Sequence, residues 1–216
     1  MFVGNRMTRN LVTIDKDADI LKVRNLFAKH DIDQLPVVQN GKLVGIITDR
    51  DIRENSPSPA STLSTHELNY LLSEIKVENI MTKKVVTVTP GTTIEAAAKL
   101  INEKRVNSLP VVVNDEPVGI ITTCDLLDIL LEFVGMDTTS SRVQLTLSST
   151  MGEIAKITRI INDMGLTIMS IVSAMKKGDP EKRTAVIRVN TDDTKELLRA
   201  FEEAGYKATT EYKVDK

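Results

Sequence analysis

The feature that most constrains the fold of this 216-residue chain is an internal repeat in its first two thirds. Three motifs each occur twice at an offset of 74 positions: Met-Thr at 7–8 and 81–82, Leu-Pro-Val-Val at 35–38 and 109–112, and Val-Gly-Ile-Ile-Thr at 44–48 and 118–122. Between residues 32–52 and 106–126, 11 of 21 ungapped positions are identical. Self-similarity at a fixed period indicates a duplicated structural unit, so the two copies are expected to share one fold.

Each copy predicts the order strand, helix, strand, strand, helix. β-branched residues at 12–14 and 85–88 indicate the first strand, and apolar residues at helical spacing follow in both copies. Asn40-Gly41 predicts a tight hairpin in copy one, whereas residues 115–117 are expected to fill the loop in copy two. The Pro- and Ser-rich stretch 56–61 predicts a linker, followed by a helix that leads into copy two.

Both copies place a threonine at a predicted strand end and an aspartate three residues later, as Thr48 and Asp51 and as Thr122 and Asp125. At a helix N-terminus this spacing suits a nucleotide, because free N–H groups and the hydroxyl can bind phosphate and the carboxylate can accept from ribose hydroxyls. The same spacing also makes a capping box, in which the acid accepts from the cap residue's N–H. The repetition does not separate these interpretations, because two duplicated helices would both need caps.

The doubled motifs together resemble tandem cystathionine-β-synthase (CBS) domains, a Bateman module, over about residues 1–133. The resemblance implies a pseudo-twofold pair of α/β repeats (β-α-β-β-α) with two clefts, each built from both repeats. It also implies an adenosine-containing ligand such as AMP, ADP, ATP, NAD or S-adenosylmethionine.

The resemblance also implies binding roles for individual residues. In one cleft the expected roles are phosphate binding by Thr48, Arg50, Arg53, Asn107 and Ser108, ribose binding by Asp51, and contact with the base by Val86 and Thr87. In the other cleft the expected ligand-binding residues are Val12, Thr13, Asp33, Gln34, Thr122 and Asp125. A carboxylate such as Asp33 is unfavourable beside a phosphate, so the second cleft is expected to be empty or to hold a less charged adenosine compound.

From residue 142 onward the pattern changes and predicts the order βαββαβ, which implies a ferredoxin-like α+β sandwich. Residues 147–171, with Gly152 before the first helix and Gly165 before the second strand, resemble an ACT domain that covers about residues 142–216. In amino-acid-sensing relatives the ligand lies beside the first turn, so Ser149, Met151 and Gly152 are candidate effector-binding residues. The alternative is that this unit only dimerises.

Composition argues against several other classes of function. The 28 basic and 30 acidic residues, with only 3% aromatics, provide neither a basic surface nor a stacking platform for nucleic acid. No apolar run approaches the roughly 20 residues that cross a bilayer, and residues 1–10 lack a signal-peptide pattern, so we expect a cytoplasmic protein and no membrane partner. Cys124, His30 and His66 make no metal cluster, and no catalytic constellation is recognisable, so neither a metal, an enzyme nor a catalytic cofactor is expected.

The sequence thus predicts a non-catalytic regulator with CBS repeats at 1–55 and 76–135, a linker and helix at 56–75, and an ACT-like domain at 142–216. We expect ligand binding between the repeats to be relayed to a regulated partner through rearrangement of a homodimer or of the ACT domain. The order of CBS and ACT domains is similar to that of acetoin-utilisation protein B-type regulators, which implies a role in acetoin or related carbon metabolism. Two alternatives are a constitutive dimerisation or assembly module and an amino-acid sensor acting through the ACT domain.

Overall fold

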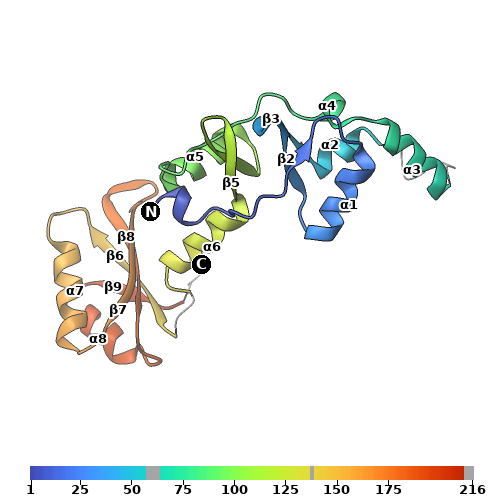
Figure 1. The fold of residues 1–216 in the computed structure, drawn as a ribbon. Helices are drawn as coiled ribbons and strands as arrows, with labels where there is room; N and C mark the ends of the chain where they lie inside the picture. The colour runs from blue at the N-terminus through green and yellow to red at the C-terminus, as the bar shows by residue number, and fades with distance from the viewer. Residues whose placement is uncertain (57–63, 137–138, 212–216) are drawn as a thin grey trace. The chain divides into compact units, whose positions relative to one another are not determined.

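The computed structural model describes residues 1–56, 64–136 and 139–211 and divides into two compact units, residues 1–126 and 127–216 (Figure 1). The first unit holds the sequence repeat, and the second holds a four-stranded sheet. The predicted linker at 56–61, apart from Ser56, and the end of the predicted last strand lie outside the described residues.

The two copies of the repeat form equivalent elements in the same order. Copy one contains β1 (Ile14–Asp15), α1 (Ile20–His30), β2 (Gln34–Gln39), β3 (Lys42–Thr48) and α2 (Asp49–Glu54). Copy two contains α5 (Ile94–Lys104), β4 (Ser108–Val113), β5 (Glu116–Thr122) and α6 (Thr123–Phe133). The turn η1 (Val3–Asn5) precedes copy one, and the helices α3 (Thr65–Glu74) and α4 (Val77–Ile80) lie between the copies. Side-chain caps at Asp19 and Thr93 begin α1 and α5, and left-handed residues, Asp31 and Arg105, end them.

The first strand of each copy is shorter than the sequence predicts. Ile14 pairs in parallel with Val37 of β2, and the equivalent pairing in copy two is a single bridge between Val88 and Val111. Residues 12–13 and 85–87 belong to no strand and are partly buried. β-branched residues favour a half-buried surface as well as strand pairing, so their enrichment here made the predicted strands too long.

Both hairpins turn over two residues with positive φ. Asn40 (φ 51°) and Gly41 (φ 79°) connect β2 to β3, as a type I′ turn requires. Asn114 (φ 51°) and Asp115 (φ 67°) occupy the same positions between β4 and β5. The predicted loop at 115–117 is therefore wrong, because Glu116 already begins β5. The aspartate tolerates the left-handed conformation in which copy one uses glycine.

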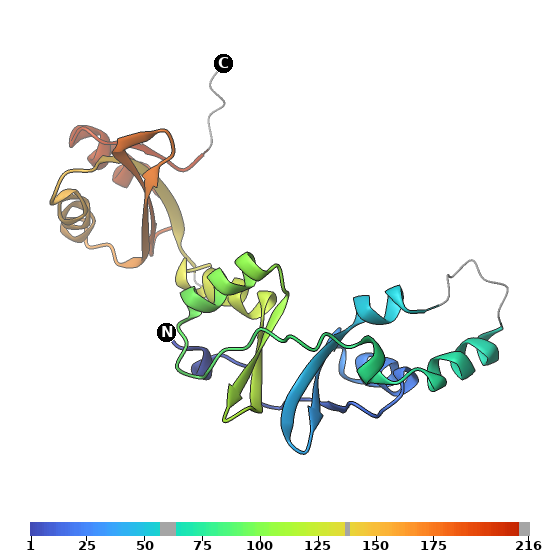
Figure 2. The ribbon, with the colours of Figure 1, turned by 90° about the horizontal axis from the view of Figure 1, so that it is seen from above.

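Each copy contributes its Met-Thr segment to the other copy. Thr8 exchanges two backbone hydrogen bonds of 2.9 and 3.1 Å with Ile120 of β5. Thr82 makes the same exchange with Ile46 of β3, at 2.9 and 3.0 Å. The two exchanges are equivalent, because Thr8 and Ile46 of copy one correspond in the repeat to Thr82 and Ile120 of copy two. In the resulting unit β3 lies beside β5 (Figure 2). Neither copy is complete without the other.

This exchange requires a glycine in each hairpin. A Cβ atom on Gly119 would lie 2.7 Å from Met7 Sδ and 2.9 Å from the carbonyl oxygen of Thr8, whereas one on Gly45 would lie 2.5 Å from Met81 Sδ. A backbone oxygen yields less easily than a flexible thioether. We therefore expect Gly119→Ala to lower the free energy of unfolding by about 2 kcal/mol and Gly45→Ala to lower it less. Urea unfolding measures both changes, and an unaltered stability of Gly119→Ala would contradict the close approach.

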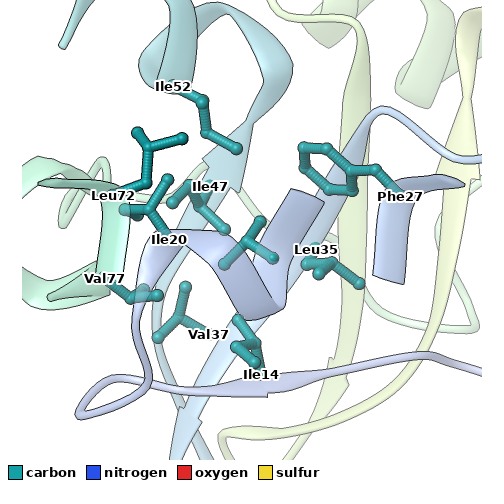
Figure 3. Close-up of a cluster of buried hydrophobic side chains, with 10 residues drawn as sticks. Ile14, Ile20, Phe27, Leu35, Val37, Ile47, Ile52, Leu72 and Val77 are labelled. Carbon is teal, nitrogen blue, oxygen red and sulfur yellow. The ribbon is translucent and has the colours of Figure 1, made fainter. Parts of the chain in front are cut away.

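The hydrophobic core of copy one lies between α1 and the β2–β3 hairpin (Figure 3). The helix predicted between the linker and copy two is confirmed as α3, which packs against α1 and buries its Leu72 in this core. The labelled core residues in the figure are Ile14, Ile20, Phe27, Leu35, Val37, Ile47, Ile52, Leu72 and Val77.

The second unit is an antiparallel sheet in the order β7-β8-β6-β9, with both helices on one face (Figure 1). Its elements are β6 (Ser141–Ser148), α7 (Glu153–Asp163), β7 (Ile168–Lys176), β8 (Asp179–Val189), α8 (Lys195–Glu203) and β9 (Lys207–Thr209). Alternate residues of β6 and β8 are buried against the helices because neighbouring strand residues face opposite sides of a sheet. The core of this unit comprises Val143, Leu145, Leu147, Ile157, Ile161, Ala185, Ile187, Val189, Leu197 and Phe201.

Candidate ligand-binding clefts

Two clefts lie where the copies meet in the first unit. We name them after their threonines: the Thr48 cleft has a volume of about 470 Å³, and the Thr122 cleft has a volume of about 510 Å³. Both volumes fall in the range of small-molecule sites, roughly 300–1,000 Å³. Each cleft joins the Thr-x-x-Asp motif of one copy to residues from the other copy. The reciprocal exchange of the Met-Thr segments explains this sharing.

The Thr48 cleft brings together most of the residues predicted for it. Only Thr87 is absent from its lining and lies instead beside a smaller cavity with Lys83. The lining consists of Asp33, Gln34, Ile46, Thr48, Asp49, Arg50, Asp51, Arg53, Glu54, Thr82, Lys84, Val85, Val86, Arg105, Val106, Asn107 and Ser108.

The Thr122 cleft likewise contains the residues predicted for it except Thr13, the counterpart of Thr87 in the repeat. Val12 and Val86, one position earlier, do line the clefts. Thr13 and Thr87, to which the family resemblance assigns ligand binding, therefore do not line the two clefts. The Thr122 cleft is lined by Thr8, Asn10, Leu11, Val12, Asp31, Ile32, Asp33, Gln34, Pro36, Ile120, Thr122 and Asp125.

The threonine and aspartate of each motif form a capping box. Asp51 Oδ2 accepts from the Thr48 N–H at 2.8 Å and from its hydroxyl at 2.7 Å, and the Thr48 hydroxyl oxygen accepts from the Asp51 N–H at 3.3 Å. Thr122 and Asp125 repeat these bonds at 2.7, 2.8 and 3.2 Å. The capping interpretation is thus confirmed. It does not exclude ligand binding, because these bonds use Oδ2 and leave Oδ1 of each carboxylate as an acceptor.

The predicted arginines of the Thr48 cleft are paired with acids on their own helix. Arg50 donates to Glu54 at 2.7 Å, and this hydrogen bond raises the pKa of Arg50 above its usual value. Arg53 pairs with Asp49 one turn earlier. Both pairs are exposed, so they are weak and a phosphate can compete for either guanidinium.

Two further cations line the Thr48 cleft that were not predicted from the sequence. Lys84 lines the cleft, and so does Arg105 at the end of α5. Neither forms an ion pair with any residue that the structure describes. They are the counterparts of Asn10 and Asp31, which line the Thr122 cleft, so the repeat offset relates the two linings only once one of them is known.

A side-chain hydrogen bond joins the two copies between the clefts. The Ser108 hydroxyl donates to Gln34 Oε1, and the two residues occupy equivalent positions of the repeat. Ser108 is only 5% exposed and is the one buried polar residue in the described part of the chain. Gln34 lines both clefts, so a group bound in either cleft would lie beside this hydrogen bond.

The candidate effector turn of the second unit is exposed. Gly152 has φ 87° and precedes α7, which accounts for a glycine there, and Met151 is 99% exposed. Ser149 donates to the carbonyl oxygen of Pro180 at 2.9 Å. A cavity of about 630 Å³ in this unit is lined by Ala155, Thr158, Arg159, Asn162, Asp163, Leu166, Thr167 and Ile168, and not by the three turn residues.

Among the described residues, no helix has both the length and the apolar character needed to span a bilayer. No group of three or more His, Cys, Asp or Glu side chains in the same part of the chain is placed to hold a metal ion.

The fold and the clefts define a class of protein: a tandem-repeat module with two clefts between its copies. The family model of the CBS domain matches residues 3–58 and 77–132, which together are just over half of the chain. The chain therefore belongs to the CBS domain family.

Three solved structures are similar to this chain over about three fifths of its length. CBSX2 in complex with AMP is 28% identical, with a TM-score of 0.50 and coverage of 60% of this chain and 96% of CBSX2. The CBS domain pair of protein MJ0100, in complex with 5′-methylthioadenosine and S-adenosylmethionine, is 27% identical, with a TM-score of 0.50 and coverage of 60% and 95%. A Vibrio cholerae structure described as an acetoin utilization protein is 27% identical, with a TM-score of 0.52 and coverage of 63% and 95%.

Proposed function

We propose that this protein is a non-catalytic regulator that binds an adenosine-containing ligand between its CBS repeats. The observation that carries the proposal is the Thr48 cleft, where an aspartate acceptor from one copy and two cations from the other, neither paired with an acid among the described residues, line one cavity. Similar CBS domain pairs bind AMP, or 5′-methylthioadenosine and S-adenosylmethionine. AMP, ADP, ATP, NAD and S-adenosylmethionine are therefore the ligands to test.

The proposed roles in the Thr48 cleft follow from charge and hydrogen-bonding capacity. Lys84 and Arg105 attract the phosphate with their positive charges, and Asp51 Oδ1 accepts from the ribose hydroxyls. Val86 supplies apolar contact for the base. The remaining proposed phosphate ligands are Thr48, Arg50, Arg53, Asn107 and Ser108.

Regulation requires that the ligand bind two states of the protein with different affinities. A ligand in either cleft touches both copies, so it can favour one spacing of the copies over another. We propose that this change passes to a partner through a homodimer or through residues 142–216. The βαββαβ order of those residues, with strands in the order β7-β8-β6-β9, supports their assignment as a ferredoxin-like ACT domain. The proposed CBS repeats comprise residues 1–55 and 76–135, joined by the linker and helix at 56–75.

A role in acetoin or related carbon metabolism is the finer part of the proposal. It is supported by the similarity to the Vibrio cholerae structure described as an acetoin utilization protein. Loss of growth on acetoin after deletion of the gene, restored by the intact chain, is the expected result. Unchanged growth would remove this pathway from the proposal and leave the ligand-binding function in place.

Asp51→Asn is expected to weaken AMP binding about tenfold with little change in the melting temperature of the free protein. The asparagine carbonyl can still accept the bonds of the capping box, whereas its amide removes the second carboxylate oxygen that would face the ribose. Isothermal titration calorimetry on nucleotide-free protein measures the affinity. Asp125→Asn is the matched control, because it makes the same change in the other capping box.

The outcome of a ligand panel decides between the proposal and its alternatives. A ligand that binds only the folded state must raise the melting temperature. No shift with any adenosine compound would overturn the proposal and favour an assembly module. That alternative has support in the edge strand β7, where Met169, Val172 and Met175 are exposed and residues 168–175 carry no charge. A shift with an amino acid alone would favour sensing by the second unit.

A further inference from the structure

The two clefts are equivalent in fold but differ in charge. The Thr48 cleft is lined by four basic residues, Arg50, Arg53, Lys84 and Arg105, and by four acidic ones, Asp33, Asp49, Asp51 and Glu54. The Thr122 cleft is lined by three acidic residues, Asp31, Asp33 and Asp125, and no lysine or arginine is among the described residues that line it. The charges of the described lining residues therefore balance in the Thr48 cleft and are negative in the Thr122 cleft, so an anionic ligand is disfavoured in the Thr122 cleft.

The repeat locates the origin of this difference position by position. Asp31 and Arg105 are counterparts that end α1 and α5 with nearly equal φ angles of 53° and 54°. The same position of the repeat thus places the Asp31 carboxylate at the Thr122 cleft and the Arg105 guanidinium at the Thr48 cleft. Asn10 and Lys84 are a second pair of counterparts, and the basic member again lines the Thr48 cleft.

The difference continues in the motif helices. At the positions of Arg50 and Arg53, copy two has Cys124 and Leu127. Asp33 lines both clefts, but only in the Thr48 cleft do the described lining residues also include cations. Carboxylates that lack a cation repel a phosphate and attract a positive group, an effect that salt weakens at exposed sites.

We infer that the two clefts select ligands of opposite charge: the Thr48 cleft takes a phosphate-bearing adenine nucleotide, and the Thr122 cleft takes a nucleoside that carries a positive charge and no phosphate. A sulfonium nucleoside such as S-adenosylmethionine has this chemistry. The inference rests on the proposed function, since it assigns a ligand class to each proposed site. The protein then responds to two ligands that do not compete for one cleft.

The test titrates the full, nucleotide-free chain with AMP and with S-adenosylmethionine by calorimetry at low ionic strength. The parent protein is expected to bind one AMP per chain, and saturating AMP should leave the affinity for S-adenosylmethionine within about threefold of its value without AMP. The double variant Asn10→Lys with Asp31→Arg gives the Thr122 cleft the cations of its counterpart. It should bind two AMP per chain and bind S-adenosylmethionine at least tenfold more weakly.

The matched control is Glu103→Arg with Glu116→Gln, which makes the same change in net charge at exposed residues outside both clefts. A second AMP site in this control would show a general charge effect and overturn the inference. Two AMP per chain in the parent protein, or competition between AMP and S-adenosylmethionine, would also overturn it while leaving the proposed function intact. A parent protein that binds no adenosine compound would instead overturn the proposed function.

Discussion

Replacing Lys84 and Arg105 together by glutamate is expected to weaken AMP binding by about 100-fold. Both cations line the Thr48 cleft, and neither is paired with an acid in the described part of the chain. Each replacement removes an attraction and adds a repulsion, which for partly screened charges costs about 1.4 kcal/mol per site. Two sites then change the free energy of binding by about 2.8 kcal/mol, or two factors of ten.

The phosphate dependence of this loss is its main check. Adenosine lacks the phosphate, so its affinity should change less than about threefold in the same variant. The loss for AMP should also shrink as the ionic strength rises, because exposed charges are screened. Calorimetry with AMP and with adenosine at two salt concentrations measures both effects. An equal loss for the two ligands would place the phosphate away from Lys84 and Arg105.

A matched control comes from the neighbouring residues in the chain. Lys83→Glu with Lys104→Glu makes the same change in charge one position away from each cleft cation, at exposed side chains that do not line the Thr48 cleft. AMP affinity should stay within about threefold in this control. A 100-fold loss there would attribute the effect to the net charge of the protein rather than to the cleft.

The repeat made the elements of each copy predictable, because a shared local pattern appears twice in register. The exchange of Thr8 onto β5 and Thr82 onto β3 was not predictable, because backbone pairing between distant segments leaves no periodic signal in a single sequence. For the same reason, the position of the helix α3 was not predictable. Its apolar residues predicted a helix, but its contact with α1 depends on how the chain turns after copy one.

The predicted ligand-binding residues show a similar division. Thr48 and Asp51 follow from a motif of fixed spacing, and the structure places both in one cleft. Lys84 stands beside Lys83 in the sequence, and only the course of the folded segment decides which of the two lines the Thr48 cleft. The pairing of Arg50 with Glu54 was visible as a spacing of four on one helix.

Phe201→Ala is expected to destabilise the second unit by about 4 kcal/mol and to leave AMP binding by the first unit unchanged. The ring is fully buried in the core of the second unit and meets Tyr206 edge-on, with ring centroids 6.4 Å apart. Truncation of a buried phenylalanine removes this packing and leaves a cavity. The first unit has its own core between α1 and the β2–β3 hairpin, so its stability should not depend on this ring.

Hydrogen exchange resolved by peptide measures both units in one experiment. Protection should fall in β6 and β8 of the variant and stay unchanged in β2 and β3. Phe201→Leu is the matched control, because it keeps an apolar side chain at the site and should cost less than half as much. Loss of protection in β2 and β3 as well would show that the two units unfold as one. Under the proposed function, unfolding as one would let a ligand of the first unit stabilise the second as well, whereas independent unfolding would exclude a relay through shared stability.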